Sequence, residues 1–166
     1  MTTPWLKLAA SYIGTKEIPG AQHNNLILGW WKWIRAPFTD DETPWCAAFV
    51  GGVLEQCNIR SSRSAAAKSY LGWGAQLKEP AVGAIVVFWR GKPNGPFGHV
   101  GFVAGRDKFG NIMVIGGNQN DAVTVKPFAL SRVLSYRWPA TIARPISGFK
   151  TLPLWESDGL VSTNEA

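Results

Sequence analysis

The chain has 166 residues, 46% of them hydrophobic and 17% charged, and its 17 lysines and arginines against 11 acidic residues give a formal charge of +6. This length and apolar content predict one globular domain with a sizeable core, and they exclude a largely disordered chain. No segment approaches the run of about 18 apolar residues that a membrane-spanning helix needs, so no membrane insertion is expected. The first residues lack the basic stretch and following apolar stretch of a secretory signal.

Helices are predicted in the first half of the chain, where apolar residues recur at helical spacing. The expected ranges are 4–13, 24–34, 45–57 and 64–70. The third helix is expected to start with Thr43 as its N-cap and Pro44 as its first residue. The second contains the stretch 30–33, Trp-Trp-Lys-Trp, whose three rings cannot all point one way on a helix, so at least one is expected to be exposed or to line a cleft.

Strands are predicted in the second half, where short β-prone runs alternate with turn residues. The expected strands are 84–89, 99–104, 112–115, 122–125 and 135–138. Helices followed by an antiparallel meander indicate an α+β fold, with N-terminal helices packed on an antiparallel sheet. Residues 1–149 are expected to form a single catalytic domain, and residues 150–166 a flexible C-terminal tail.

The two cysteines differ in their predicted surroundings. The helix between Cys46 and Cys57 separates them by roughly 16 Å, at about 1.5 Å per residue, which is too far for a disulfide. Cys57 is expected to be a small buried residue. Cys46 falls in the first turn of the helix, where free N–H groups and the helix dipole favour a thiolate and can hold an oxyanion. The alternative for Cys46 is a second packed thiol, because acidic residues at 40–42 oppose a thiolate charge.

The two histidines also differ. His23 lies in a polar loop and is expected at the surface, whereas His99 begins a predicted strand after a glycine- and proline-rich loop. In the simplest hairpin register His99 lies opposite Gly116 and shares a face with Asn118. Asn118 would then accept the ring N–H of His99 and leave the other ring nitrogen for a thiol. A register slip of one residue would put Gln119 there instead, and an ordinary structural histidine with a turn asparagine is the alternative.

Three short segments stand in a set order: PWCAAFV at 44–50, GHVGFV at 98–103 and GGNQ at 116–119. Together they resemble the landmarks of the NlpC/P60–CHAP superfamily of papain-like cysteine hydrolases, which cut peptidoglycan. The run PAVGAIVVF at 80–88 is similar to the family's strand ahead of the histidine, with Ala84 in place of the usual polar residue. The run IGTKEIPG at 13–20 resembles a subfamily frequent in tailed-phage endolysins.

The resemblance spans roughly residues 5–144 and implies a papain-like α+β fold. It implies Cys46 as the nucleophile, His99 as the base and Asn118 as the third polar residue, with no cofactor and no metal. Many CHAP domains carry a glutamate two positions before this asparagine, where the present chain has Gly116. The orienting role therefore falls to Asn118 or to a residue that the sequence does not identify.

The substrate that the resemblance implies is bacterial peptidoglycan. The expected function is a cysteine hydrolase of its amide bonds, either an endopeptidase or an N-acetylmuramoyl-L-alanine amidase, acting as a cell-lysing endolysin. Trp45, Trp89 and Gln119 are the candidate substrate-binding residues. The positive charge suits an anionic cell envelope, and the absence of a basic run or a nucleic-acid motif makes nucleic acid an unexpected partner. The protein is expected to be a monomer.

Several alternatives remain open on the sequence alone. The same chemistry suits a secreted antibacterial toxin with an immunity protein as its partner. Other interpretations are a non-catalytic wall-binding module and a lysozyme-like glycosidase using Glu17 or Glu42, although the β-rich second half argues against the latter. The expected location is synthesis in the cytoplasm and action on the wall, in the periplasm, after holin release or delivery by a secretion system.

Overall fold

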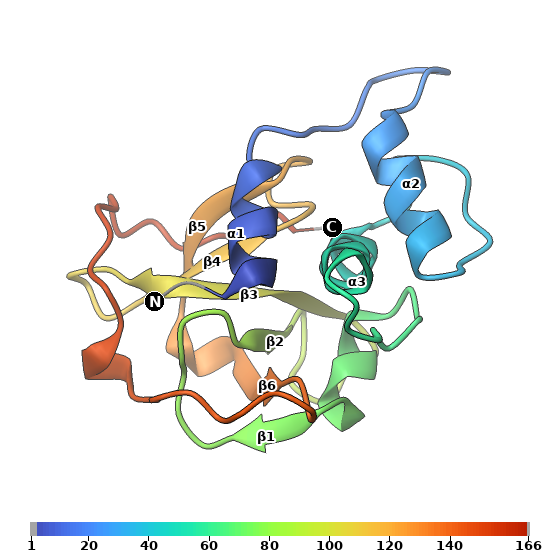
Figure 1. The fold of residues 1–166 in the computed structure, drawn as a ribbon. Helices are drawn as coiled ribbons and strands as arrows, with labels where there is room; N and C mark the ends of the chain where they lie inside the picture. The colour runs from blue at the N-terminus through green and yellow to red at the C-terminus, as the bar shows by residue number, and fades with distance from the viewer. Residues whose placement is uncertain (1–2, 166) are drawn as a thin grey trace.

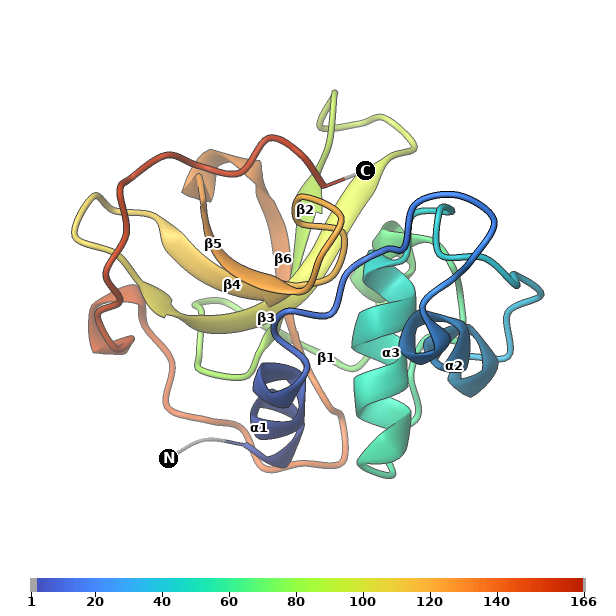
Figure 2. The ribbon, with the colours of Figure 1, turned by 90° about the horizontal axis from the view of Figure 1, so that it is seen from above.

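Helices from the first half of the chain lie on one side of a single antiparallel sheet in the computed structural model, which describes residues 3–165 (Figure 1, Figure 2). The helices are α1 (Pro4–Ser11), α2 (Asn25–Trp33) and α3 (Cys46–Gln56), with short 3₁₀ helices η1 (Ala67–Gly72), η2 (Leu130–Arg132) and η3 (Phe149–Thr151). The strands are β1 (Ala75–Leu77), β2 (Ile85–Trp89), β3 (Gly98–Arg106), β4 (Ile112–Gly116), β5 (Thr124–Phe128) and β6 (Val133–Trp138). Their order in the sheet is β1-β6-β2-β3-β4-β5. This confirms the predicted α+β fold.

The first two helices begin where polar side chains satisfy their free N–H groups. The hydroxyl of Thr3 accepts a hydrogen bond from the N–H of Leu6 at the start of α1, and Asn24 accepts one from Leu26 at the start of α2. Both caps place a helix close to its predicted range. None of the helices within residues 3–165 is long and apolar enough to cross a bilayer.

The start of α3 differs from the prediction. The helix begins at Cys46 with Trp45 as its N-cap, so Thr43 and Pro44 precede it. Thr43 is instead held in the preceding loop, where its N–H and its hydroxyl donate to the carboxylate of Asp40. Because the loop uses Thr43 in this way, Cys46 becomes the first residue of the helix.

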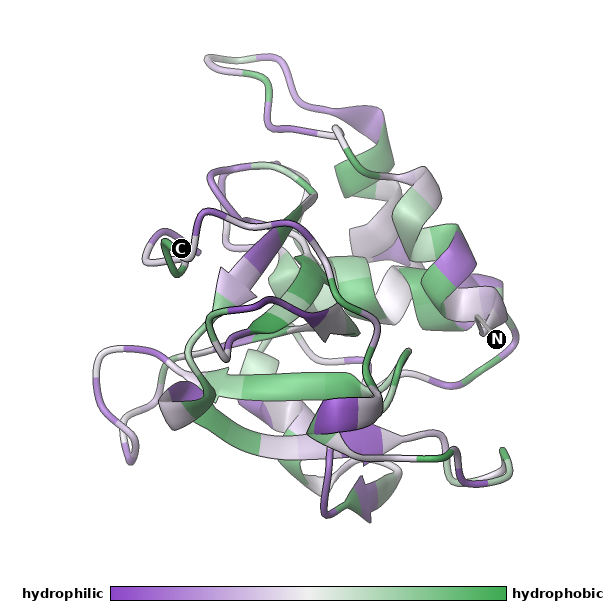
Figure 3. Cartoon of the chain, turned by 90° about the vertical axis from the view of Figure 1, so that its left-hand side faces the viewer, coloured by the Kyte–Doolittle hydropathy of each residue, from purple (hydrophilic) through white to green (hydrophobic). Residues whose placement is uncertain are grey.

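α3 is the central helix of the core, between the sheet and α2 (Figure 2). A Cβ at Gly51 would lie 2.3 Å from Cγ2 of Ile34, and one at Gly52 would lie 2.7 Å from Cδ1 of Trp30, so glycine is needed for α2 to approach this closely. In the tryptophan-rich stretch Trp30 and Trp31 are buried and Trp33 is 48% exposed, as the helical spacing predicted. The central strands are hydrophobic along most of their length (Figure 3).

The second half departs from the predicted elements in a few places. The predicted helix 64–70 is the 3₁₀ helix η1, and the short edge strand β1 was not predicted. Between β3 and β4, Phe102 pairs with Ile115, and the register shifts between Val103 and Gly105. The hairpin closes on the pair Arg106–Ile112 and not on Ala104–Asn111, so β3 and β4 do not adopt the simplest hairpin register.

The segment after residue 149 lies along the sheet on the side away from the helices (Figure 2). Backbone N–H groups of Trp155 and Ser162 donate to Arg106 and Pro127, and that of Asn120 donates to Asn164. Near its end Glu165 is buried and pairs with Arg132. The tail predicted from the sequence is therefore in contact with β3 and β5.

Candidate active site

The thiol of Cys46 lies at the first residue of α3 and is only 5% exposed. The N–H of Val100, the residue after His99, is close enough to act on this thiol, as are the N–H groups of Ala47 and of Cys46 itself. Burial raises the pKa of Cys46, and these N–H groups together with the charge of Arg90 act in the opposite direction. The thiol is thus a neutral group surrounded by donors that would stabilise negative charge.

The imidazole of His99 is buried at the start of β3, one residue before the Val100 N–H that acts on the thiol. Its ring stacks on that of Phe128, with centroids 5.2 Å apart and planes at 5°, and Phe88 stacks in turn on Phe128. Burial lowers the pKa of His99 to about 4, although its hydrogen bond to Gln119 acts in the opposite direction. His99 is therefore a neutral imidazole, the form that can accept a proton.

Gln119 holds His99 by a hydrogen bond of 3.0 Å between Oε1 and Nε2 of the ring. The amide nitrogen of Gln119 donates to the carbonyls of Val114 at 3.2 Å and Thr124 at 2.9 Å, and to the hydroxyl of Thr124. Since carbonyls only accept, the amide nitrogen must face them and Oε1 must face the imidazole. The ring nitrogen Nε2 of His99 therefore carries the hydrogen.

This tautomer leaves the lone pair of His99 on Nδ1. Nδ1 is buried and has no hydrogen-bond partner among residues 3–165. Nucleophilic catalysis by cysteine needs a neutral imidazole with one nitrogen fixed and the other free, together with a thiol, and this chain has both groups: the thiol of Cys46 is at a helix N-terminus and is approached by the N–H of Val100, the residue after His99. The first-turn N–H groups of α3 are placed to bind the oxyanion of an attacked carbonyl.

Gly116 explains why a side chain from the loop can reach His99. A Cβ at Gly116 would lie 2.2 Å from Oε1 of Gln119 and 3.1 Å from Nε2 of His99. The carboxamide of Gln119 thus occupies the space into which a side chain at 116 would point, and this is the position where many CHAP domains carry glutamate. In this chain the hydrogen-bond partner of His99 is instead Gln119, three residues after Gly116.

Asn118 does not contact His99, contrary to the geometry expected from the hairpin. Its Oδ1 accepts a hydrogen bond from the backbone N–H of Trp45, the N-cap of α3, and its Nδ2 donates to Glu17 Oε1 at 3.3 Å. Its backbone has a positive φ of 58°, which asparagine tolerates better than most residues. Asn118 therefore holds the start of the helix that carries Cys46, and the one-residue alternative, Gln119, reaches the histidine.

The residues predicted to bind substrate are placed differently from one another. Trp45 and Gln119 are fully buried, and the indole N–H of Trp45 donates to Glu17 at 2.8 Å, so these two side chains support the site from within. Trp89 is partly exposed, with its indole N–H on the carbonyl of Ser131. Of the three, only Trp89 presents surface to a ligand. Glu17, which sequence reasoning gave only to the glycosidase alternative, is the shared acceptor for Trp45 and Asn118.

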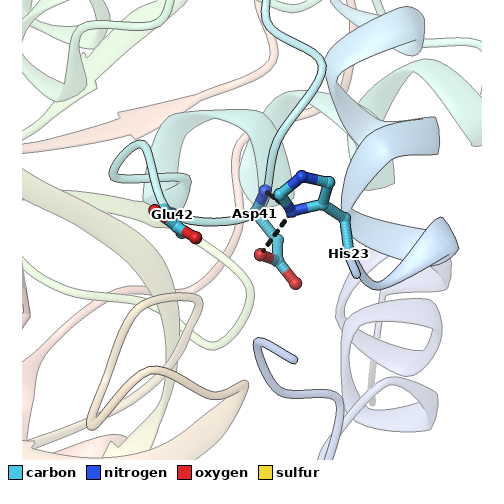
Figure 4. Close-up of side chains that lie close together, drawn as sticks. All are labelled: His23, Asp41 and Glu42. Carbon is cyan, nitrogen blue, oxygen red and sulfur yellow. Dashed lines mark hydrogen bonds and ion pairs between the residues drawn. The ribbon is translucent and has the colours of Figure 1, made fainter. Parts of the chain in front are cut away.

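The remaining cysteine and histidine lie outside this cluster. Cys57 is the half-buried C-cap of α3, and both thiols are free. Nδ1 of His23 lies 3.1 Å from Oδ1 of Asp41, with Glu42 nearby (Figure 4). Oδ2 of Asp41 already accepts two backbone N–H groups, from Ile18 and Asn24 at 2.8 Å each. These hydrogen bonds explain why Asp41 is buried: its carboxylate binds the backbone of the neighbouring loop.

A known domain family matches part of this chain. No curated protein matches the sequence. The family model of the CHAP domain matches residues 38–118, a segment that contains Cys46 and His99 and ends one residue before Gln119. CHAP domains are peptidoglycan hydrolases of the cysteine-peptidase type. Residues 38–118 of this chain thus match the CHAP domain, which is part of the papain-like NlpC/P60–CHAP superfamily, and the α+β architecture is consistent with such a domain.

Proposed function

We propose that this protein cleaves amide bonds of bacterial peptidoglycan, with Cys46 as nucleophile and His99 as general base and acid. Gln119 orients His99, and Asn118 fixes the helix start that carries the thiol. The observation that supports this most directly is the bond from Gln119 to His99, because it leaves the lone pair of the buried Nδ1 free to take a proton. A histidine with a purely structural role would be expected to use both ring nitrogens.

The proposed reaction starts from a neutral pair, because burial raises the pKa of Cys46 and lowers that of His99. Nδ1 of His99 takes the thiol proton as the sulfur attacks the carbonyl carbon, and the N–H groups of Cys46 and Ala47 receive the oxyanion. The imidazolium then gives its proton to the departing amine, leaving an acyl-enzyme. Water, deprotonated by the same nitrogen, hydrolyses the thioester and restores the thiol.

The biological role that we propose is that of an endolysin, which reaches the wall from the cytoplasm after membrane permeabilisation. The chemistry above suits an endopeptidase and an N-acetylmuramoyl-L-alanine amidase equally, since both attack an amide carbonyl. Glu17 is bonded to Trp45 and Asn118 in this protein, which favours a structural role for it over that of a glycosidase acid.

The test is digestion of purified peptidoglycan followed by mass spectrometry of the products. New amino groups are expected with the wild type and with Cys57→Ala, the matched thiol control, and none with Cys46→Ala or His99→Ala. Circular dichroism establishes that each variant is folded. Lysis by a folded Cys46→Ala protein, or new reducing ends in place of amines, would overturn the proposal.

A further inference from the structure

Arg90 follows β2 directly and lies beside His99. In the β2–β3 hairpin Phe88 pairs with His99 and Trp89 with Gly98, and the backbone N–H of Arg90 donates to Phe97 at 3.1 Å. Side chains alternate between the faces of a strand. Arg90 therefore projects from the same face as Phe88 and is a diagonal neighbour of His99.

The guanidinium of Arg90 forms no ion pair with any carboxylate of residues 3–165. Its Nε is buried and has no hydrogen-bond partner among residues 3–165, and its Cζ lies 5.5 Å from the centre of the Phe97 ring. Two other partly exposed arginines have acidic partners: Arg63 binds Glu55, and Arg132 binds Glu165. A partly buried cation without an anion is costly, which suggests that its partner comes from outside the chain.

The charge of Arg90 also reaches the reacting groups. It is among the influences that lower the pKa of Cys46 against the larger effect of burial, and it adds to the effect of burial in lowering the pKa of His99. The cation is therefore close to both side chains that would act on the scissile bond. A group of the substrate that is bound by Arg90 would therefore belong to a substrate residue next to the scissile bond.

We propose that Arg90 binds a carboxylate of the substrate peptide next to the scissile amide, which makes the enzyme selective for an acidic stem peptide. This inference rests on the proposed function and adds the substrate feature that the site recognises. Nε and one Nη of a guanidinium form a fork that matches the two oxygens of a carboxylate. The unpartnered Nε of Arg90 supplies one half of that fork.

The test uses two synthetic stem peptides that span the bond identified by the peptidoglycan digest. They differ only in carrying a free carboxylate or its carboxamide at the residue next to that bond. The wild type is expected to cleave the carboxylate peptide with a kcat/KM about tenfold or more higher, as for a charge-assisted hydrogen bond. Arg90→Gln is expected to lose this preference, mainly through KM, and Arg90→Lys to keep part of it. Arg60→Gln removes an equal charge at an exposed position and is expected to behave as the wild type.

The outcomes separate the two proposals. Equal cleavage of both peptides by the wild type, or an unchanged preference in Arg90→Gln, overturns the role of Arg90 and leaves the proposed hydrolase in place. The wild-type comparison needs no variant, so it decides the question even where Arg90→Gln fails to fold. Cleavage of neither peptide, with no amines released from peptidoglycan, overturns the proposed function and the role of Arg90 together.

Discussion

Adding a single methyl group at Gly116 should disable the candidate site without removing any polar group from it. The new Cβ in Gly116→Ala would lie 2.2 Å from Oε1 of Gln119, which is far inside van der Waals contact. To restore an ordinary separation, the oxygen must retreat by more than about 1 Å, roughly the margin between its present 3.0 Å bond to His99 and no bond at all. Gly116 is not among the residues with a positive φ, so alanine fits its backbone and acts only through space.

The magnitude follows from the hydrogen bond that is lost. An unsatisfied buried N–H on His99 costs about 1–3 kcal/mol, and if that cost falls on the transition state, kcat/KM drops about 5- to 150-fold. The bond also selects the tautomer, so the neutral imidazole of Gly116→Ala should become a mixture of Nδ1–H and Nε2–H forms. Kinetics on a soluble peptide measure the first effect, and ¹⁵N chemical shifts of the imidazole measure the second.

A double-mutant cycle completes this test. Because the added methyl group acts through Gln119, the pair Gly116→Ala/Gln119→Ala should lose little more activity than Gln119→Ala alone. Gly29→Ala is the matched control, since a Cβ there meets nothing within 4 Å. A Gly116→Ala enzyme with wild-type kcat/KM and an undisturbed Nε2–H tautomer would refute the reasoning.

Two further predictions concern stability. Burial lowers the pKa of His99 to about 4 from an ordinary value of 6.5, so the unfolded chain binds more protons between these values, and stability falls as the pH falls through that window. The loss from this group is about 3 kcal/mol; it is absent above about pH 6.5 and complete below about pH 4. Plotted against pH from 7 to 4, the urea-unfolding free energies of wild type and His99→Gln should therefore differ in slope, and parallel curves would contradict this prediction. Asn118→Gly keeps the left-handed backbone but leaves the N–H of Trp45 unbonded, so it should lower the free energy of unfolding by about 1 kcal/mol; a midpoint in urea equal to that of the wild type would show that the bond is dispensable.

Much of the site was predictable because its two reacting groups depend on local sequence. Cys46 could be placed at a helix start, although one turn signal, Thr43-Pro44, proved to belong to the preceding loop. His99 could be placed at a strand start by the change from a glycine-rich loop to a β-prone run. These features follow from patterns within a few residues of each other.

The orienting residue was not predictable in the same way. Its identity depends on the register of the β3–β4 hairpin, on the turn at Asn118, and on the space above Gly116. Each of these involves contacts between segments far apart in the chain, and no local pattern encodes them. The sequence therefore left Asn118 and Gln119 as neighbouring alternatives, and only the packed structure assigns one to the imidazole and the other to α3.

The hydrogen bonds of the loop that carries Gln119 limit how far the protein can be shortened while its candidate site is kept intact. Backbone bonds join it to the segment after α1: Gly14 donates to Val123 at 2.9 Å, Val123 to Thr15 at 2.7 Å, and Glu17 to Asp121 at 3.0 Å. The segment that matches the family model ends at Asn118 and begins well after these bracing residues. A fragment trimmed to that match would keep the thiol and the imidazole but lose Gln119, the amide that is hydrogen-bonded to the imidazole. Any transplant of this unit into a chimeric protein must therefore carry both the segment after α1 and the loop beyond β4.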